Sequence, residues 1–585
     1  MPSTVDADTP TRKKRGVNLR RALAHPGRWL ALVIAAYIAF SFTLSYLRVI
    51  ELSVSNWDLG IFQQALWSTN HGYLLYESGD WEGNGVASFL QIHPAPILFA
   101  LVPIYAVAPS PLTLLAVQSA VVGLAAVPLY WIGVRVLRRS WAALGLAGLY
   151  LAFAPVLSSN LYDFHMEAFL PLELFLLFYL WLTDRYFLAF VPAVAAFTTL
   201  EVGPFLVAAV AVYFLTAPSD PATTPPLRSP GPTPPPAPAG ARVRAWWAQR
   251  GVRWSMLLLL SCLIAYAVLR EFEWQILPND IGLPAPVASG FLSQSTIANS
   301  SGVTINLAFR TQLGLKLGYW LTLLALLAFL PLLAPRELLL TAPWFAFTLQ
   351  SNQGVWVHFG YQYGFIAVTG IMIGAVFGLR NVYGYLLPWT RARAVPRLPA
   401  SVQHRWRTWP EGRRRGVVAA GAVGMLGVLV LTNLALTPAN PSEQNPNSAS
   451  PAYHVSYHVV PGYLNAVATA ALIPGGAWVL SSDDLFPLVA DNDHAYCLLW
   501  IPAPPQYLPF SNSSLPQFVF LSTSQDFAVP LWLWPNLANE STYGLYGVVV
   551  TSPVGQIDLY ELGYTGPTLF PGPQPPGGTG PIFRG

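Results

Sequence analysis

The sequence predicts an α-helical polytopic membrane protein with a small external α/β domain near its C-terminus. Three observations lead to this fold class. Only 10% of the 585 residues are charged, whereas a soluble protein would carry roughly a quarter. Hydrophobic residues make up 54% of the chain, and several apolar runs approach or exceed the ~20 residues that cross a bilayer. Basic residues recur between these runs, as they do in the cytoplasmic loops of membrane proteins.

Apolar runs and basic loops together favour eleven spans, with a cytoplasmic N-terminus and an external C-terminus. This topology places most of the 31 lysines and arginines on the cytoplasmic side. It requires that the short, proline-rich segment 94–109 does not cross, so we expect this segment to be re-entrant or interfacial. The expected spans are 29–50, 112–134, 141–157, 168–183, 186–201, 203–217, 254–274, 315–334, 338–350, 361–379 and 416–436.

A basic N-terminal segment and a proline-rich linker mark the limits of two transmembrane modules. Residues 1–28 are basic and show no signal-cleavage pattern before the first apolar run, so we expect a cytoplasmic N-terminus and a retained first span. Residues 218–253 begin with a proline-rich stretch that cannot build a core, which predicts a cytoplasmic linker. The linker separates an N-terminal transmembrane module, 29–217 with its outer loop 51–111, from a C-terminal module, 254–436.

The last part of the chain predicts the external domain, residues 437–562. A helix is expected near 459–472. Buried strands are expected at 477–480, 518–521 and 547–550, with an edge strand at 557–562. Residues 563–585 are rich in proline and glycine and are expected to be disordered.

Composition also excludes several function classes. The net charge of +4 is spread between the spans rather than gathered in one patch, so we expect no nucleic-acid partner. Cys262 and Cys497 lie in unlike surroundings and are expected to be free thiols rather than a disulfide or a zinc site. The chain contains no phosphate-cradling loop of the G-x-x-x-x-G-K-[ST] kind, so ATP-driven transport is not expected of it.

Asp58 follows the first span closely, in a loop that the topology places outside. A carboxylate held at the membrane surface can act as a general base for an acceptor hydroxyl or can bind a divalent cation. Trp57 beside it suits an interfacial position that also contacts substrate. The alternative is that Asp58 is only the N-cap of a helix that begins at Leu59.

Asp163, His165 and Glu167 alternate through a short outer turn between two spans. Spacing of two in an extended turn aims side chains in the same direction. Carboxylate and imidazole ligands could then hold a divalent metal cation that positions a phosphate-bearing donor. The alternative is a solvated turn at the end of a helix.

Three further residues face the same predicted side. His93, at the start of segment 94–109, could hydrogen-bond a phosphate, and Glu201 between two apolar runs needs a partner or must be neutral. His358 lies in an aromatic turn and could face the same cavity, or it could belong to an interfacial belt. Each of the three could instead be an ordinary solvated or interfacial group. The segment 491–494, Asp-Asn-Asp-His, resembles a metal motif but is more typical of a polar turn.

These motifs resemble a family of polytopic prokaryotic membrane proteins called domain of unknown function 2079. The resemblance covers residues 50–215 well and the remainder by its layout. It is carried by Trp57-Asp58-Leu59-Gly60-Ile61-Phe62-Gln63-Gln64-Ala65-Leu66-Trp67, His93-Pro94-Ala95-Pro96-Ile97, Pro109-Ser110-Pro111-Leu112-Thr113-Leu114 and Asp163-Phe164-His165-Met166-Glu167.

That family is similar in turn to the C-type (GT-C) glycosyltransferases, which use polyprenyl-phosphate-linked sugars. By this resemblance, Asp58 takes the place of the catalytic acid of the first outer loop. Asp163 and Glu167 stand near the second-loop acids, which bind metal in some relatives. Where the family carries a Lys-Glu pair at the end of the fifth span, this chain has Leu200-Glu201, which puts a lysine contact to phosphate in doubt.

The leading hypothesis is therefore transfer of a sugar from a polyprenyl-phosphate donor to an acceptor at the extracytoplasmic face of the cell membrane. Membrane lipids and the lipid-linked donor are the expected partners, and a divalent cation is the expected cofactor. Asp58 would be the catalytic base, with Trp57, His93, Glu201 and His358 near the substrate. A transporter or lipid translocator is the rival hypothesis, but it needs polar groups near the centres of spans. A non-catalytic scaffold that presents the external domain is the third.

Overall fold

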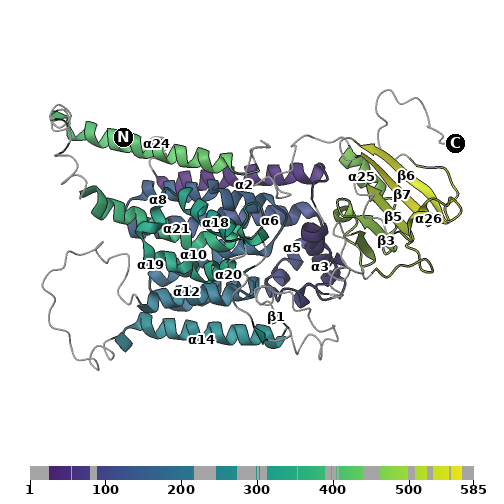
Figure 1. Cartoon of the computed structure of the whole chain (residues 1–585), viewed down its shortest axis with the longest axis horizontal. Helices are drawn as coiled ribbons and strands as arrows, with labels where there is room; N and C mark the ends of the chain where they lie inside the picture. Colours follow the sequence, from purple (N-terminus) through teal and green to yellow (C-terminus); the bar gives the residue numbers. More distant parts are fainter. Residues whose placement is uncertain are drawn as a thin grey trace, which may run out of the picture.

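The computed structural model describes residues 25–54, 56–79, 88–216, 246–272, 298–299, 302–303, 312–351, 354–388, 397, 399, 404, 408–438, 462–498, 508–522, 531–551 and 555–569. These residues form a helical bundle with a small sheet at one end (Figure 1). Most of the predicted N-terminal segment 1–28, of the linker 218–253 and of the tail 563–585 lies outside the described residues, so these assignments stay predictions.

Helices occupy the positions of all the expected spans, but they differ in length. Five stretches are long and apolar enough to cross a membrane, and the bent pair α8–α9 would make a sixth. The expected count of eleven is not confirmed, because α10, α11, α12, α18 and α20 each have 14 residues or fewer and a helix needs about 20 to span ~30 Å. The bounds are α2 Pro26–Ile50, α3 Ile61–Asn70, α5 Val102–Val107, α6 Pro111–Leu124, α7 Ala126–Leu137, α8 Ser140–Ala152, α9 Ala154–Leu161, α10 Leu170–Leu182, α11 Tyr186–Thr199, α12 Gly203–Thr216, α14 Arg250–Glu271, α18 Leu313–Ala325, α19 Pro335–Leu338, α20 Ala342–Gln350, α21 Gly364–Asn381 and α24 Glu411–Ala435.

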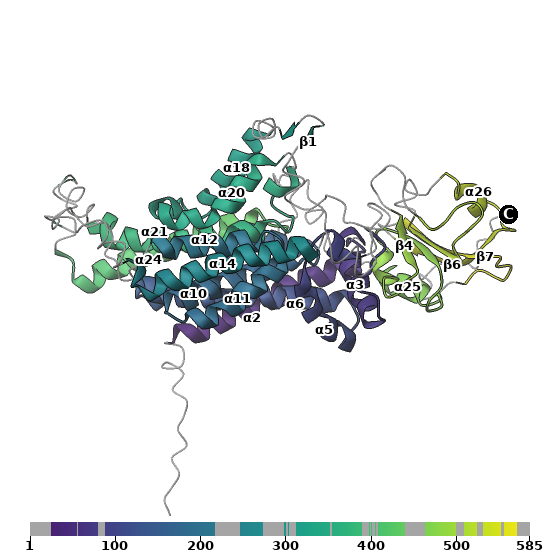
Figure 2. The same ribbon diagram turned by 90° about the horizontal axis from the view of Figure 1, so that it is seen from below.

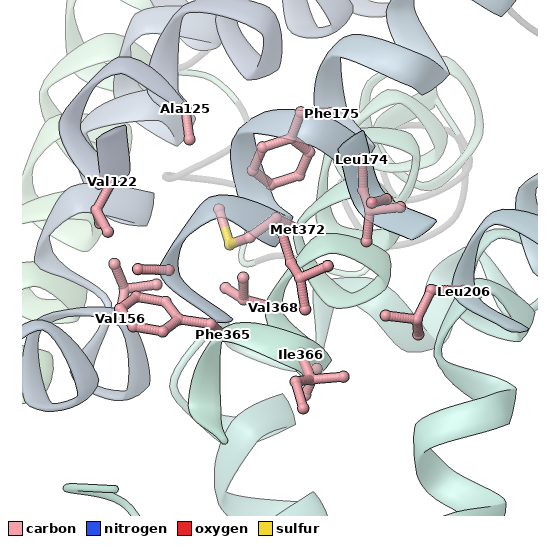
Figure 3. Close-up of a cluster of buried hydrophobic side chains, with 14 of the residues drawn as sticks. Val122, Ala125, Val156, Leu174, Phe175, Leu206, Phe365, Ile366, Val368 and Met372 are labelled. Atoms are coloured by element: carbon pink, nitrogen blue, oxygen red, sulfur yellow. The ribbon is translucent and has the colours of Figure 1, made fainter. Parts of the chain in front are cut away.

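Helix α21 is the centre of the bundle, and nearly all of its residues are buried. Its apolar side chains meet others from α6, α9, α10 and α12 (Figure 3). Three glycines spaced by four, Gly370, Gly374 and Gly378, lie along it. A Cβ added at Gly378 would lie 1.9 Å from the carbonyl oxygen of Leu330, in the 3-10 turn η6 (Leu330–Leu333). Small residues at this spacing let the backbones of neighbouring membrane segments approach closely.

The break between α8 and α9 is stabilised by a distant asparagine. The two helices are bent by 42°, and the Pro155 ring favours the first turn of a new helix. The amide of Ala154 at this break donates to Oδ1 of the buried Asn433, at 2.9 Å, and Asn433 Nδ2 donates to the carbonyl of Leu326 at 3.0 Å. This side chain therefore fastens the end of α24 to two other segments of the bundle.

Segment 94–109 forms two short helical pieces rather than a span. These are the 3-10 helix η3 (Pro96–Ala100) and α5 (Val102–Val107), and Tyr105 of α5 is fully buried. Even one continuous helix over these residues would be too short to cross a bilayer. Helix α5 of this segment packs against α3. Both α3 and α5 lie between the bundle and the sheet (Figures 1 and 2).

The sheet has five strands in the order β4-β3-β5-β7-β6. Strand β3 runs parallel to β4 and β5, and the other pairs are antiparallel. The sequence predicts β3, β5, β6 and β7 but misses β4, and β7 is an inner strand rather than an edge because β6 pairs along it. The bounds are β3 Val479–Ser482, β4 Ala495–Leu498, β5 Phe518–Ser522, β6 Tyr543–Thr551 and β7 Gly555–Leu562, with helices α25 Gly462–Ala470, η12 Phe486–Leu488 and α26 Trp534–Leu537; β1 Ala298–Asn299 and β2 Gly302–Val303 form a separate short pair.

Gln64 of α3 joins loop 51–111 to the sheet. Its side chain is fully buried, and its Nε2 donates to the carbonyls of Asn492 at 2.9 Å and Ala495 at 3.1 Å. Its Oε1 accepts from the amide and the hydroxyl of Ser78, at 2.7 and 3.0 Å. Every polar atom of this buried amide thus has a partner, which makes the contact specific.

A second set of contacts lies beside Gln64. Gln63 Nε2 donates to the carbonyl of Pro487 at 3.0 Å, and the Tyr105 hydroxyl donates to Asp491 Oδ1 at 2.6 Å. Residues 487–495 are therefore a docking turn between the two parts of the structure, in agreement with the interpretation of 491–494 as a polar turn.

Replacing Gln64 with leucine should loosen this docking by about 2 kcal/mol, because it leaves buried amide and carbonyl groups without partners. Hydrogen exchange of residues 479–498 should then become faster than in the wild type. Asn70→Ala is the matched control, since Asn70 lies on the same helix and, among the described residues, its side chain donates only to the carbonyl of Leu66 in that helix. Equal exchange in all three proteins would contradict the assigned role of Gln64.

Candidate functional site

Asp58 lies in a π-helical turn, η1 (Asn56–Gly60), between the end of α2 and α3. Its carboxylate is buried and holds two partners from the turn after α9. His165 Nε2 lies 3.0 Å from Oδ1, and the Tyr162 hydroxyl donates to Oδ2. The rings of Tyr162 and His165 are stacked with their centroids 5.3 Å apart, so each holds the other in place. The structure thus brings together two motifs separated by about a hundred residues of sequence.

Arg48, in the last turn of α2, binds the turn that carries Tyr162 and Asp163. Its guanidinium is almost fully buried and lies 2.9 Å from Asp163 Oδ1. It also donates to the carbonyls of Leu161, Tyr162 and, at 2.9 Å, Ser53. The planar guanidinium can reach several acceptors at once, which the ammonium group of a lysine cannot do in the same geometry.

Gln118 of α6 holds the backbone of this turn. Its Oε1 accepts from the amide of His165 at 2.7 Å, and its Nε2 donates to the carbonyl of Asp163 at 3.0 Å and to that of Asn160 at 3.2 Å. The turn can therefore be buried without losing its backbone hydrogen bonds.

A second pair, His93 and Glu201, lies near Glu167. His93 Nδ1 is 3.2 Å from both carboxylate oxygens of Glu201. Glu167 is buried, and its Oε2 has no hydrogen-bond partner among the described residues. The charges of His165, His93 and Glu201 all act on Glu167. The predicted residues Asp58, His165, Glu167, His93 and Glu201 therefore belong to one neighbourhood.

The electrostatics favour an ionised Asp58 opposite a protonated His165. Burial alone would raise the pKa of Asp58, but the hydrogen bonds and charge of His165, the Tyr162 hydroxyl and the charge of Arg48 together lower it. Burial alone would lower the pKa of His165, but Asp58, Glu167 and the Asp163 carbonyl raise it. Both ring nitrogens of His165 face acceptors, as an imidazolium requires. Burial raises the pKa of Glu167, which favours its neutral form.

The stability that this pair adds should depend on pH in both directions. Because folding lowers the pKa of Asp58, its contribution is present above the usual value of 3.8 and is lost as the pH falls through the lowered value. Because folding raises the pKa of His165, its contribution is complete below the usual value of 6.5 and is lost as the pH rises through the raised value. The melting temperature should therefore fall on the alkaline side of pH 6.5.

The variant His165→Gln separates this effect from other titrations. Glutamine can still donate a hydrogen bond toward Asp58 but carries no charge. The decrease in melting temperature between about pH 6 and about pH 9 should be smaller in the variant than in the wild type. The same decrease in both proteins would show that another group is responsible.

The metal site predicted at Asp163, His165 and Glu167 is not assembled as one ligand set. Among the described residues, no group of three or more His, Cys, Asp or Glu side chains is placed to hold a metal ion. Asp163 faces Arg48, and His165 turns its Nε2 to Asp58. The three residues named as ligands do not fit a shared cation, and the divalent cation itself stays a prediction.

Two residues that the sequence places near the substrate, Trp57 and His358, are not seen to contact Asp58 among the described residues. The side chain of Trp57 lies outside the described residues. His358 bonds the carbonyl of Phe359 through Nδ1, at 3.2 Å, and its ring lies 6.2 Å from that of Tyr361. Tyr361 in turn packs edge-on against Tyr162. His358 is thus linked to the centre through two tyrosines, and its role at a substrate stays a prediction.

Sequence reasoning missed Arg48, Tyr162 and Gln118. Arg48 had a detectable signal, because it is a charged residue within the first predicted span, where a charge is costly and usually functional. Gln118 is likewise a polar side chain inside an apolar run. Tyr162 had no such signal, since a tyrosine at the end of a span is common at the membrane interface.

Comparison with known proteins identifies the family. No curated protein matches the chain. Among the solved structures that match is ArnT from Cupriavidus metallidurans in the apo state, at 15% identity and a TM-score of 0.42, covering 94% of this chain and 99% of that chain. The family model described as "Predicted membrane protein (DUF2079)" matches residues 48–525, a range that includes Asp58, His93, the 163–167 turn and Glu201. Together with the long apolar helices, this match assigns the chain to the DUF2079 family of multi-pass membrane proteins.

Proposed function

We propose that the protein is a membrane glycosyltransferase that moves a sugar from a polyprenyl-phosphate donor to an acceptor at the extracytoplasmic face. The observation that carries the proposal is the buried carboxylate of Asp58, held between His165 and Tyr162 at the end of the bundle; these partners lower its pKa. Burying such a charge is costly unless its partners offset the cost, so a carboxylate kept ionised there suggests a chemical role. The proposed topology has the N-terminus in the cytoplasm and the sheet outside.

In the proposed reaction, Asp58 takes the proton of an acceptor hydroxyl as that oxygen attacks the anomeric carbon of the sugar. The new bond joins the acceptor oxygen to this carbon, and the bond from the carbon to the phosphate oxygen breaks. The polyprenyl phosphate leaves with the bonding electrons. His93, on the segment that enters η3, would hydrogen-bond the phosphate in this reaction. Prealigned donors and charges of this kind stabilise a leaving group without reorganising during the reaction.

The position of the carboxylates supports group transfer over transport. Asp58 and Glu167 lie in turns outside the long apolar helices, and Glu201 lies just beyond the end of α11. Glu173, which accepts from Thr199 at 2.9 Å, lies in the first turn of α10, at the same end. A transporter would need such groups midway along its spans. The specific hydrogen bonds around Asp58 also favour a chemical site over a scaffold.

The proposal is tested with purified protein in lipid nanodiscs. Lipid-linked sugars and cell-envelope glycans extracted from native membranes are added, and polyprenyl phosphate is measured by mass spectrometry. We expect release of polyprenyl phosphate together with a glycan product heavier by one sugar residue. Unchanged donor after prolonged incubation with active, folded protein would refute the proposal, and so would movement of the intact donor across a sealed proteoliposome membrane.

A further inference from the structure

Three carboxylates of the candidate site, those of Asp58, Asp163 and Glu201, each lie beside a basic side chain of the protein itself. Arg48 lies 2.9 Å from Asp163, His165 lies 3.0 Å from Asp58, and His93 lies 3.2 Å from Glu201. In each pair the two partners come from distant parts of the sequence. These are the acidic residues that would otherwise call for a bound cation, and Asp163 was predicted from its spacing to be a metal ligand.

The Arg48–Asp163 pair involves one of the three predicted metal ligands. The side chains of both residues are only 2% exposed. A divalent cation bound to Asp163 would lie beside a permanently charged guanidinium in a medium of low dielectric constant, where like charges repel strongly. Hard cations also need six or more oxygen ligands, and the carbonyls of Leu161 and Tyr162, which precede Asp163 in the chain, already accept hydrogen bonds from Arg48.

Arg48 also determines where the reacting groups lie. It holds the carbonyls of residues 161 and 162 from the end of α2, and it holds Ser53 on the path to η1. The first contacts fix the backbone that carries Tyr162 and His165, and the last fixes the segment that leads to Asp58. Arg48, together with Gln118, therefore helps to set the distance between Asp58 and its two partners, and it brings a positive charge into the site.

We propose that Arg48 is a positioning residue that takes the structural and electrostatic place of a divalent cation, so that the site works without a metal. This inference rests on the proposed glycosyl transfer for its kinetic consequences only. Its consequence for metal binding holds whatever the reaction is, because that consequence depends on the occupied carboxylate of Asp163.

The first test measures metal binding directly. Wild-type protein is dialysed against EDTA and analysed for metals, and its melting temperature is measured with and without millimolar MgCl₂, MnCl₂ or CaCl₂. We expect no stoichiometric metal before dialysis and no change in melting temperature with any of the three salts beyond that caused by NaCl of equal ionic strength. A stoichiometric metal, or a specific stabilisation by one cation that Asp163→Asn abolishes, would overturn the proposal.

The second test uses variants of Arg48. Arg48→Lys keeps the charge but cannot bind all the acceptors, so we expect the kcat of transfer to fall roughly 10- to 100-fold with little change in the KM for the donor. Arg48→Ala should lose more activity, and added divalent cations should not restore it. Arg28→Lys, at the exposed start of the same helix, is the matched control and should behave as the wild type. An unchanged kcat in Arg48→Lys would overturn the positioning role.

The results distinguish a failure of the inference about Arg48 from a failure of the proposed function. If the wild type transfers no sugar at all, the glycosyltransferase proposal fails, while the metal measurements still decide whether Arg48 excludes a cation. If the wild type transfers sugar but loses activity with EDTA and regains it with one divalent cation, the proposed function stands and the inference about Arg48 is refuted.

Discussion

Replacing Asp58 with asparagine is expected to lower the rate of sugar transfer by roughly 10²- to 10⁴-fold, the usual contribution of a general base. Asparagine has nearly the same shape, and its side-chain oxygen can still accept from Tyr162 or His165. It cannot take a proton from an acceptor hydroxyl. The variant should therefore fold and bind the donor, and its defect should lie in kcat rather than in KM.

A matched carboxylate is available at the opposite end of helix α10. Asp184 follows α10 and accepts a hydrogen bond from the hydroxyl of Tyr186, as Asp58 does from Tyr162. Asp184→Asn removes the same charge from the same kind of pair, and it should leave the transfer rate unchanged. If Asp58→Asn retains more than a tenth of the wild-type kcat, or if both variants lose activity equally, Asp58 is not the base.

Placing alanine at Gly378 is expected to destabilise the bundle by about 3 kcal/mol or more, at the upper end of the usual cost of overpacking. The added Cβ would lie 1.9 Å from the Leu330 carbonyl oxygen and 2.7 Å from its carbonyl carbon. Both are backbone atoms, so no side-chain rotation relieves the clash. Helix α21 would have to move away from η6, and its buried side chains would lose contacts on several helices.

The control is a glycine in another helix with free space around it. No atom of the described part of the chain lies within 4 Å of a Cβ added at Gly148 of α8, so Gly148→Ala should leave stability unchanged or raise it slightly, since alanine favours helix. Thermal denaturation in detergent, followed by the fluorescence of a dye that reacts with the buried thiols Cys262 and Cys497 as they become exposed, compares the three proteins. A melting temperature of Gly378→Ala equal to that of the wild type would show that α21 and η6 are not in tight contact.

Several features of this structure could be predicted from sequence because they depend on local composition. Apolar runs give the helices of the bundle, and the meeting of Asp58 with the 163–167 turn follows from placing span ends on one side of a membrane. Short strands of buried residues were also predicted, except for β4. That strand directly follows the polar residues 491–494, and its pairing with β3 is set by tertiary contacts that the local pattern does not contain.

Pairing between distant residues is what the sequence could not provide. The place of residues 163–167 between two apolar runs predicted a turn there, and their spacing of two suggested that Asp163 and His165 share one ligand. The structure gives each a different partner, Arg48 and Asp58, because a buried carboxylate is stabilised by the cation that tertiary packing brings to it. Neither partner lies within a hundred residues of the turn, so no local pattern could reveal it.

The docking of Gln64 has a consequence for biosynthesis. Gln64 is translated early, yet its partner Asn492 lies 428 positions later in the chain. The apolar helices are all synthesised before the acceptors of the Gln64 amide, the carbonyls of Asn492 and Ala495. The turn η1, which carries Asp58, contacts η12 near residue 487. It therefore acquires its final surroundings only near the end of translation. Premature termination before residue 487 would leave Gln63 and Gln64 without their acceptors in residues 487–495.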